Sequence, residues 1–534
     1  PMPLAHPLTR MRVEREQCLR TLSVWRFALS AAGRKRCGTS PARSADGFGV
    51  KKRTQRSGGA RKRSRGSLLD LVSSFSEPVS SATAANFRCL CAGALLNRGR
   101  GWISRAVSLA RYFGSSKHHS TLYRFFSRAQ WCPDAIGRRV FEFALRWVEG
   151  TVEIAVDDTL CKRTGPHVWG TGVHIDPLAT IYKNDVRAVT KKAFAYGHSW
   201  VVVSLRLRPS WIDGPGFAIP ILARLYRSKK SCPEEEYMKR TGLAAQMIDR
   251  VHSWLPSGRA LSIVGDHEYA CRAVIGALPA GTTFTGPLPK DARFFEQPPR
   301  QRVRRAGRPR KRGARLRSPE QIGRDRGTKW RRIRVQIYSR SVWLEVFEQR
   351  GLWYSVDQDR VCRMIVTRDP RGRYGTRAIV TTDLHASAAR IIERYSRRWL
   401  IEVMFRHAKQ HLGLGRAQNG WEKGAGSRKE RRTRREEGQG RGHRGRLAVE
   451  RTVPFTLILH ATVVLHGLRV TRRTVPVLLQ QLRPWAEQGR KASFEDLLCA
   501  CRVELASQAI PPDPAGRHIR KKLAVPLATA LVAA

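Results

Sequence analysis

Three aspartates follow apolar stretches, at positions where functional side chains are common. Asp157 and Asp158 follow the apolar stretch Val152–Val156, and Asp266 follows Leu261–Val264 after a single glycine. Both stretches are rich in β-branched residues and predict strands, and α/β sheets tend to place their sites at the carboxyl ends of strands. One Asp after a strand is often only a turn or a helix cap. Two such places in a chain this poor in acids favour a carboxylate site.

A third acidic position lies in the helical pattern from Ser387 to His411. At 100° per residue, a stripe about 60° wide holds four polar side chains of this pattern, those of Tyr395, Arg398, Glu402 and Lys409. One carboxylate among Tyr, Arg and Lys suits a metal ligand flanked by phosphate-binding donors. The alternative is a solvated face with i, i+4 ion pairs such as Arg398 with Glu402.

The elements that must position these residues alternate in type from residue 152 onward. Strand patterns occur at Val152–Val156, Trp200–Leu207, Leu261–Val264, Val335–Tyr338, Val342–Phe347 and Ala378–Thr381. Helical patterns occur at Glu234–Trp254 and Ser387–His411. Strands that alternate with helices predict an α/β domain with a mixed sheet.

The preceding residues, 67–150, have a helical pattern throughout. Basic side chains gather near one of its helices, Arg124 among them, which would allow that helix to meet DNA in helix-turn-helix fashion. The alternative is a basic solvent-facing side on an ordinary helical bundle.

Composition points to a polyanionic partner. The chain of 534 residues has 100 Lys and Arg against 42 Asp and Glu, a formal net charge of +58. With 41% hydrophobic residues it is too apolar to be a disordered basic tail throughout. The 11 cysteines show neither disulfide-framework nor zinc spacing. No apolar stretch reaches membrane-span length, so we expect a soluble protein of a reducing compartment.

Three basic runs punctuate the chain, at Lys51–Arg65, Arg300–Arg317 and Arg428–Arg446. Such blocks repel themselves and are usually solvated. The second contains Arg308, Arg310 and Lys311 around a Gly-Arg-Pro core that resembles a minor-groove AT-hook but lacks the preceding Arg. We interpret it as a nonspecific phosphate binder, with the AT-hook as the alternative.

The motifs resemble those of a known family. The segment YSRRWLIEVMFRHAK, residues 395–409, resembles the Tyr-x2-Arg-x3-Glu-x6-Lys signature of bacterial insertion-sequence transposases of the DDE superfamily, including the Trp after the Arg. VDDTLCKRTG and IVGDHEYA resemble that family's first and second Asp motifs, in the expected order. The resemblance extends from about residue 67 to 470, and residues 1–66 match nothing recognisable.

The resemblance implies an RNase H-like core with a β-rich insertion, in which Asp158, Asp266 and Glu402 bind two Mg²⁺ ions, with Mn²⁺ as a substitute. Side chains alternate across a strand, so only one of Asp157 and Asp158 faces the metals; the Asp-Thr pairing favours Asp158, with Asp157 as the alternate. By similarity, Tyr395, Arg398 and Lys409 bind phosphates beside the scissile bond. Trp399 faces away from the polar stripe, and we expect it in the core.

The expected organisation has seven parts. They are a basic leader (1–66), a helical DNA-binding domain (67–150), the first part of the RNase H-like core (151–290), an insertion with a basic loop (291–375), the end of the core with the signature helix (376–423), a basic run (424–446) and a helical C-terminal region (447–534). We expect a cytoplasmic, nucleoid-associated bacterial protein.

The leading interpretation is a DNA transposase that binds terminal inverted repeats, cleaves the element ends and joins them to target DNA, as a homodimer in the synaptic complex. One alternative is an RNase H-like nuclease without strand transfer. Another is a decayed copy that acts only as a basic DNA-binding protein.

Overall fold

The computed structural model describes residues 66–98, 103–110, 113, 118–163, 168–177, 179–182, 189–210, 214–298, 310–338, 340–372, 375–416, 441–470 and 493–509. All of them belong to one compact unit, Arg65–Ala534. The predicted leader, apart from Gly66, lies outside the described residues, as do Arg308 and residues 424–440 of the third basic run.

Within the described part of the chain, ten strands form one mixed sheet. They are β1 (Val152–Lys162), β2 (Gly172–Ile175), β5 (Phe194–Leu207), β6 (Phe217–Tyr226), β7 (Leu261–Gly265), β8 (Thr282–Pro287), β9 (Arg331–Ile337), β10 (Arg340–Leu352), β11 (Val361–Arg368) and β12 (Arg377–Thr381). Their order is β2-β5-β1-β7-β8-β12-β11-β10-β9, and β6 pairs with β5. The short β3 (Ile181–Tyr182) and β4 (Val189–Lys191) pair separately.

The central strands β1, β7 and β8 are parallel, and the remaining pairs of this sheet are antiparallel. This mixed sheet is consistent with an RNase H-like core, and all six predicted strand segments fall in it. Tyr338, the last residue of one segment, lies just past the end of β9. The expected insertion does not form a separate layer, because β12 pairs with both β8 and β11 and so joins β9–β11 to the same sheet.

The helices are α2 (Leu68–Phe75), α3 (Ser81–Leu96), α4 (Ile103–Ala110), α5 (His119–Ser127), α6 (Pro133–Leu145), α7 (Arg240–Ser253), α8 (Arg272–Ile275), α9 (Pro319–Arg324), α10 (Ala388–Ser396), α11 (Trp399–His411), α13 (Arg441–Val470) and α15 (Phe494–Ala509). Two short 3₁₀ turns, Lys229–Ser231 and Glu234–Glu236, precede α7. The helix expected over Glu234–Trp254 therefore begins six residues later than the pattern indicated.

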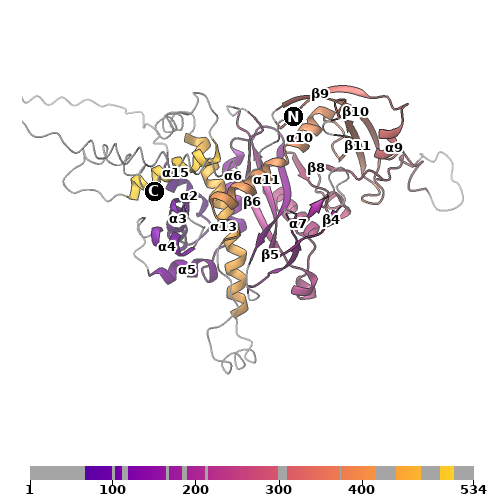
Figure 1. Cartoon of the computed structure of the whole chain (residues 1–534). Helices are drawn as coiled ribbons and strands as arrows, with labels where there is room; N and C mark the ends of the chain where they lie inside the picture. The colour runs from indigo at the N-terminus through magenta and orange to yellow at the C-terminus, as the bar shows by residue number, and fades with distance from the viewer. Residues whose placement is uncertain are drawn as a thin grey trace, which may run out of the picture. The chain divides into compact units, whose positions relative to one another are not determined.

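Two layers of helices cover opposite faces of the sheet around β1 (Figure 1). On one face, Met247 and Ile248 of α7 join the core that contains Val201 and Val203 of β5. On the other, Met404 and Phe405 of α11 pack with the neighbouring residue Val202. Since side chains alternate along a strand, consecutive residues of β5 serve two separate packing layers.

The N-terminal helices α2–α6 confirm the helical pattern of residues 67–150, and they share one core with α13 and α15. Phe455 of α13 makes edge-to-face contacts with Phe87 and Phe126. Arg451 of α13 donates to the carbonyl oxygens of Phe126 and Trp131. In Figure 1, α13 runs between these helices and β6. The N-terminal helical region is thus attached to the ten-stranded sheet through α13.

Helix α13 contains one segment, Gly445–Val470, that is long and apolar enough to cross a membrane by length and composition alone. Most of it is buried inside the protein, as expected for a core helix. Its first turns include the end of the third basic run, where Arg446 pairs with Glu236 and Glu450. This part of the run is therefore helical.

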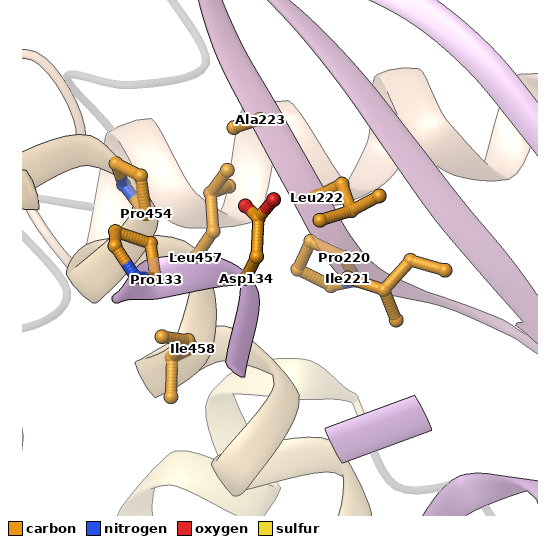
Figure 2. A pocket seen from close by; sticks show the side chains of 9 residues that line it. All are labelled: Pro133, Asp134, Pro220, Ile221, Leu222, Ala223, Pro454, Leu457 and Ile458. Carbon is orange, nitrogen blue, oxygen red and sulfur yellow. The ribbon is translucent and has the colours of Figure 1, made fainter. Parts of the chain in front are cut away.

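Figure 2 shows a small recess where α6, β6 and α13 meet. Apart from Asp134, the labelled residues are apolar, and Arg224 donates to both Asp134 carboxylate oxygens. Helix α6 lies very close to β6, and only glycine fits at position 137. A Cβ atom there would be 2.1 Å from the Ile221 carbonyl oxygen. With a single carboxylate that is already paired, the recess has the character of a packing junction.

Candidate active site

Strand β1 presents Asp157 and Asp158 to opposite faces of the sheet. Asp157 pairs in register with Val202, which belongs to the core around α11. Asp158 pairs with Val201, which belongs to the core around α7. Directly opposed residues of an antiparallel pair share a face, so Asp157 faces the signature helix and Asp158 faces away from it.

Asp157 is joined to Glu402 through one arginine. The Arg398 Nη1 atom lies 2.6 Å from Asp157 Oδ2, and its Nη2 atom lies 2.5 Å from Glu402 Oε1. Asp157 is only 8% exposed, so this ion pair is largely removed from water. The guanidinium fork is well suited to hold two carboxylates in a fixed relation.

The signature segment is not one continuous helix, which corrects the expectation for Ser387–His411. Helix α10 ends at Ser396 and α11 begins at Trp399. The turn between them has short-range bonds, from the Arg398 amide to the Tyr395 carbonyl and from the Ile401 amide to the Arg398 carbonyl. Tyr395 therefore lies on a different helix from Glu402 and Lys409, and a single angular stripe does not describe all four residues.

The other signature residues surround this centre in different ways. Burial raises the pKa of Tyr395, and Arg398 beside it acts in the opposite direction. Lys409, on α11, lies near the buried Cys161 thiol of β1. Trp399 was expected in the core, but that expectation is wrong: it is 45% exposed and contacts Tyr338 edge to face.

Asp158 has its own arginine on the other face. Arg240, the first residue of α7, places its Nε atom 3.9 Å from Asp158 Oδ2 and 3.2 Å from the Ser199 hydroxyl. Its Nη1 atom lies 3.4 Å from both Glu268 carboxylate oxygens. The guanidinium also stacks over the Tyr226 ring, at 4.5 Å from the ring centre.

Asp266 lies between the two faces. It follows β7, whose last residue, Gly265, pairs with Val156 just before the two aspartates of β1. Its Oδ1 atom accepts a hydrogen bond from the Glu268 amide at 3.0 Å. Asp266 raises the pKa of both Asp157 and Asp158, so its carboxylate is close to each of them.

Burial and repulsion between neighbouring carboxylates raise the pKa of Asp157 and of Asp158. Burial raises the pKa of Asp157 to about 7, Arg398 opposes this rise, and Asp266 and Asp158 add to it. Burial likewise raises the pKa of Asp158 to about 6, opposed by Arg240 and reinforced by Glu268 and Asp266. Crowded, partly dehydrated carboxylates of this kind are often found at functional sites, where a cation offsets their charge.

The donor chemistry fits a hard divalent cation, because carboxylate oxygens are the ligands that Mg²⁺ and Mn²⁺ prefer. Among the described residues, however, no three His, Cys, Asp or Glu side chains are close enough together to form a ready metal cage. Arg398 lies between Asp157 and Glu402 and contacts both carboxylates. Its positive charge offsets part of the negative charge that would otherwise attract a cation here.

Sequence reasoning missed three charged residues that organise the site. Glu153 is the one charge in the apolar stretch Val152–Val156, which is a usable signal. Glu268 lies two residues after Asp266, in the same motif. Arg240 carries no local signal, because only the packing of α7 brings it to Asp158.

The predicted DNA-binding residues outside the centre have mixed placements. Arg124, Arg310 and Lys311 are exposed, and Arg308 lies outside the described residues. Close to the end of the basic run, Arg312 stacks over Phe295, at 4.1 Å from the ring centre. This end of the run is therefore attached to the folded unit, where it can hold a phosphate backbone near it.

Comparison with known families gives one match. A family model described as DDE superfamily endonuclease matches residues 72–342, just over half of the chain. The matched region contains both aspartates of β1 and Asp266, and it ends before α10 and α11. No curated protein matches the chain.

Proposed function

Since the chain belongs to the DDE superfamily endonucleases, we propose that it is a transposase that cleaves the ends of its own DNA element and joins them to target DNA. DNA as the substrate and a divalent cation as the cofactor follow from the family. The insertion-sequence branch, the joining step, the terminal inverted repeats, the homodimeric synaptic complex and the nucleoid location in a bacterial cytoplasm are part of the proposal.

The observation that carries the proposal is the placement of Asp157, which contacts Arg398 and lies near Asp266. Arg398 also contacts Glu402, so one arginine links the first and third predicted acids, which are far apart in sequence. Asp266, the second, raises the pKa of Asp157 and is therefore close to it. The geometry favours Asp157 over Asp158 as the carboxylate that works with Glu402.

The chain's own residues then have distinct roles. Asp157, Asp266 and Glu402 would hold the divalent cations, and these would supply charge stabilisation for the attacking and leaving oxygens of a phosphodiester. Arg398 offers its guanidinium to a non-bridging phosphate oxygen once it leaves a carboxylate. Tyr395 and Lys409 orient the neighbouring phosphates, which positions the substrate more than it reads the sequence.

The basic surface supplies affinity that does not depend on sequence. Each phosphate that Lys or Arg neutralises releases condensed counterions, so binding weakens as salt rises. Exposed Arg310 and Lys311 belong to this surface. We assign recognition of the terminal repeats to the helical region of residues 67–150, where Arg124 is exposed on α5.

The test uses a plasmid that carries the element's own ends, purified full-length protein and Mg²⁺. Excision with joining of the ends to a second plasmid supports transposition, whereas cleavage without joining supports a nuclease that lacks strand transfer. Asp266→Asn and Glu402→Gln should each abolish cleavage and leave DNA affinity within about twofold. No cleavage by the wild-type protein, with intact DNA binding, would support a decayed copy.

A further inference from the structure

Glu153 is a partly buried charge on the same face of β1 as Asp157. The two residues are four positions apart, and alternation along a strand gives even-numbered separations a common face. The Glu153 side chain is 15% exposed. The mechanism described above gives it no role, so its burial in an otherwise apolar stretch requires a reason.

Three arginines from three elements surround the Glu153 carboxylate. Arg206 of β5 places Nη1 2.8 Å from Oε2. Arg397, in the turn between α10 and α11, places Nη2 3.2 Å from Oε1 and 3.4 Å from Oε2. Arg394 of α10 places Nε 3.7 Å from Oε1. One carboxylate thus connects the catalytic strand, its antiparallel neighbour and the helix turn of the signature segment.

Arg394 extends the connection to the loop that precedes α10. It is 5% exposed, and its Nη1 atom lies 2.9 Å from Asp383 Oδ2. Asp383 in turn accepts hydrogen bonds from the amides of His385 and Ala386 through Oδ1. Arg394 therefore connects the last turn of α10 both to Glu153 of β1 and to the loop that precedes the helix.

The charges at Glu153 depend on one another. Burial raises the pKa of Glu153, but Arg206, Arg397 and Arg394 outweigh this effect and hold it below its ordinary value. Arg397 in turn lowers the pKa of Arg206, as expected for like charges in close proximity. Without the carboxylate, these arginines would repel each other in a site with little water to screen them, and the turn would move.

The turn held by Glu153 carries the active-site arginine. Arg397 contacts Glu153, and the next residue, Arg398, contacts Asp157 on the same face of β1. Helix α11, with Glu402, begins one residue later. Two consecutive arginines therefore attach the start of α11 to two carboxylates of one strand, one outside the reaction centre and one inside it.

We propose that Glu153 is a positioning residue, which holds the α10–α11 turn through Arg397 and so sets where Arg398 and Glu402 meet Asp157. The proposal rests on the proposed function of the same centre. It predicts that loss of the Glu153 charge misplaces Glu402 without removing any group that contacts substrate. A displacement of about 1 Å can cost a reaction roughly 100-fold in rate.

The test compares Glu153→Gln with Asp134→Asn as a matched control. Asp134 is similarly buried, at 18% exposure, and pairs with Arg224 at the α6–β6 junction, outside the carboxylate centre. Single-turnover cleavage of a bound terminal-repeat duplex at saturating Mg²⁺ should fall roughly 10- to 100-fold in Glu153→Gln, with DNA affinity within twofold of wild type. Asp134→Asn should lower the melting temperature and leave the cleavage rate unchanged.

A double-mutant cycle identifies the route through Arg397. If Glu153 acts by holding Arg397, the Glu153→Gln/Arg397→Gln double variant should cleave no more slowly than the slower single variant. Additive losses would overturn the proposal, as would wild-type cleavage by Glu153→Gln or equal losses in both carboxylate variants. If Glu153→Gln does not fold, Arg397→Gln carries the same comparison with Asp134→Asn, because Glu153 keeps two arginines.

A metal-binding readout separates this inference from the proposed function. Without DNA, Mn²⁺ should raise the melting temperature of the wild-type protein and of Asp134→Asn by similar amounts, and that of Glu153→Gln by clearly less. This difference should persist even if the wild-type protein cleaves no terminal-repeat DNA, which would count against transposition alone. An equal Mn²⁺ effect in all three proteins would contradict the positioning role.

Discussion

The neighbouring aspartates at the centre of β1 meet different partners on opposite faces of the sheet. Asp157 contacts Arg398, which also holds Glu402 of α11. Asp158 lies beside Arg240, which also holds Glu268 near the end of β7. At each aspartate one arginine thus provides a link to a second carboxylate, and Asp266 is close to both aspartates.

The two faces differ in how closely their arginines approach the carboxylates. Arg398 lies 2.6 Å from Asp157 and 2.5 Å from Glu402, and Tyr395 is beside it. Arg240 lies 3.9 Å from Asp158 and 3.4 Å from Glu268, with the Ser199 hydroxyl and the Tyr226 ring as further contacts. Similar charge patterns on the two faces therefore differ in contact distance, and the proposed function places the reaction on the face with the shorter contacts.

The largest difference in cleavage rate between the two faces is expected when each arginine is replaced. Arg398→Ala should reduce single-turnover cleavage roughly 100-fold by misplacing the scissile phosphate, with affinity for long DNA nearly unchanged, because many other basic residues hold the backbone. Arg240→Ala should reduce cleavage less, about tenfold or below. Affinity and cleavage measured on the same duplex test this ranking, and equal losses would remove the distinction between the faces.

The pH dependence of stability should also distinguish the faces. The raised pKa values of Asp157 and Asp158 mean that, without metal, the stability these two groups contribute decreases as pH rises from about 4 to about 7. His198 and His407, whose pKa burial lowers to about 4, contribute in the opposite direction over the same range, so each variant is compared with the wild-type profile. Asp157→Asn should change the slope of that profile more than Asp158→Asn does, because the pKa of Asp157 is raised to about 7 and that of Asp158 to about 6. Thermal unfolding from pH 4 to 8 checks the slopes.

Mg²⁺ provides a control for the same experiment. It should stabilise the wild-type protein more at pH 8 than at pH 5.5, because ionised carboxylates bind the cation. A pH profile of Asp157→Asn that coincides with the wild-type profile in the absence of metal would contradict the crowding of these acids.

The smallest effect on the cleavage rate is expected from the second basic run, Arg300–Arg317. Deletion of Arg300–Arg317 removes ten Lys and Arg residues and should flatten the slope of log affinity against log salt, since that slope is near −0.9 per neutralised phosphate. Preference for the terminal repeats over random DNA should remain. Loss of that preference would favour the AT-hook interpretation instead.

The sequence allowed six of the ten strands of the sheet to be predicted, because alternation and β-branched residues are local signals, but β2, β6, β8 and β11 were not predicted. Asp157 and Asp158 were expected just after a strand, whereas β1 continues to Lys162 and holds both. The Asp-Thr pairing favoured Asp158, but Asp157 is the aspartate that meets α11, because the β1–β5 register and the packing of α11 decide this. In β6, Pro220 interrupts the pattern. The structure accommodates Pro220 beside a register shift at Val203 and Ser204.

The break between α10 and α11 had no local signal, because neither proline nor glycine occurs at residues 397 and 398. A tertiary cause fits the contacts, since Arg397 and Arg398 each pair with a carboxylate of β1. The exposure of Trp399 follows from the periodicity of α11, because its buried side is formed by Ile401, Met404, Phe405 and Ala408, and Trp399 lies on the opposite side at 100° per residue. Long-range ion pairs, which no periodicity records, therefore account for the break but not for the exposure of Trp399.

The most direct test of the central claim is a side-by-side measurement of Asp157→Asn and Asp158→Asn. Single-turnover cleavage of a terminal-repeat duplex in saturating Mg²⁺ should fall on the order of 10³-fold or more in Asp157→Asn, which loses a carboxylate of the reaction centre. Asp158→Asn should retain activity within about tenfold of wild type. The reverse ranking, with Asp158→Asn inactive and Asp157→Asn active, would contradict the assignment of the α11 face as the catalytic one.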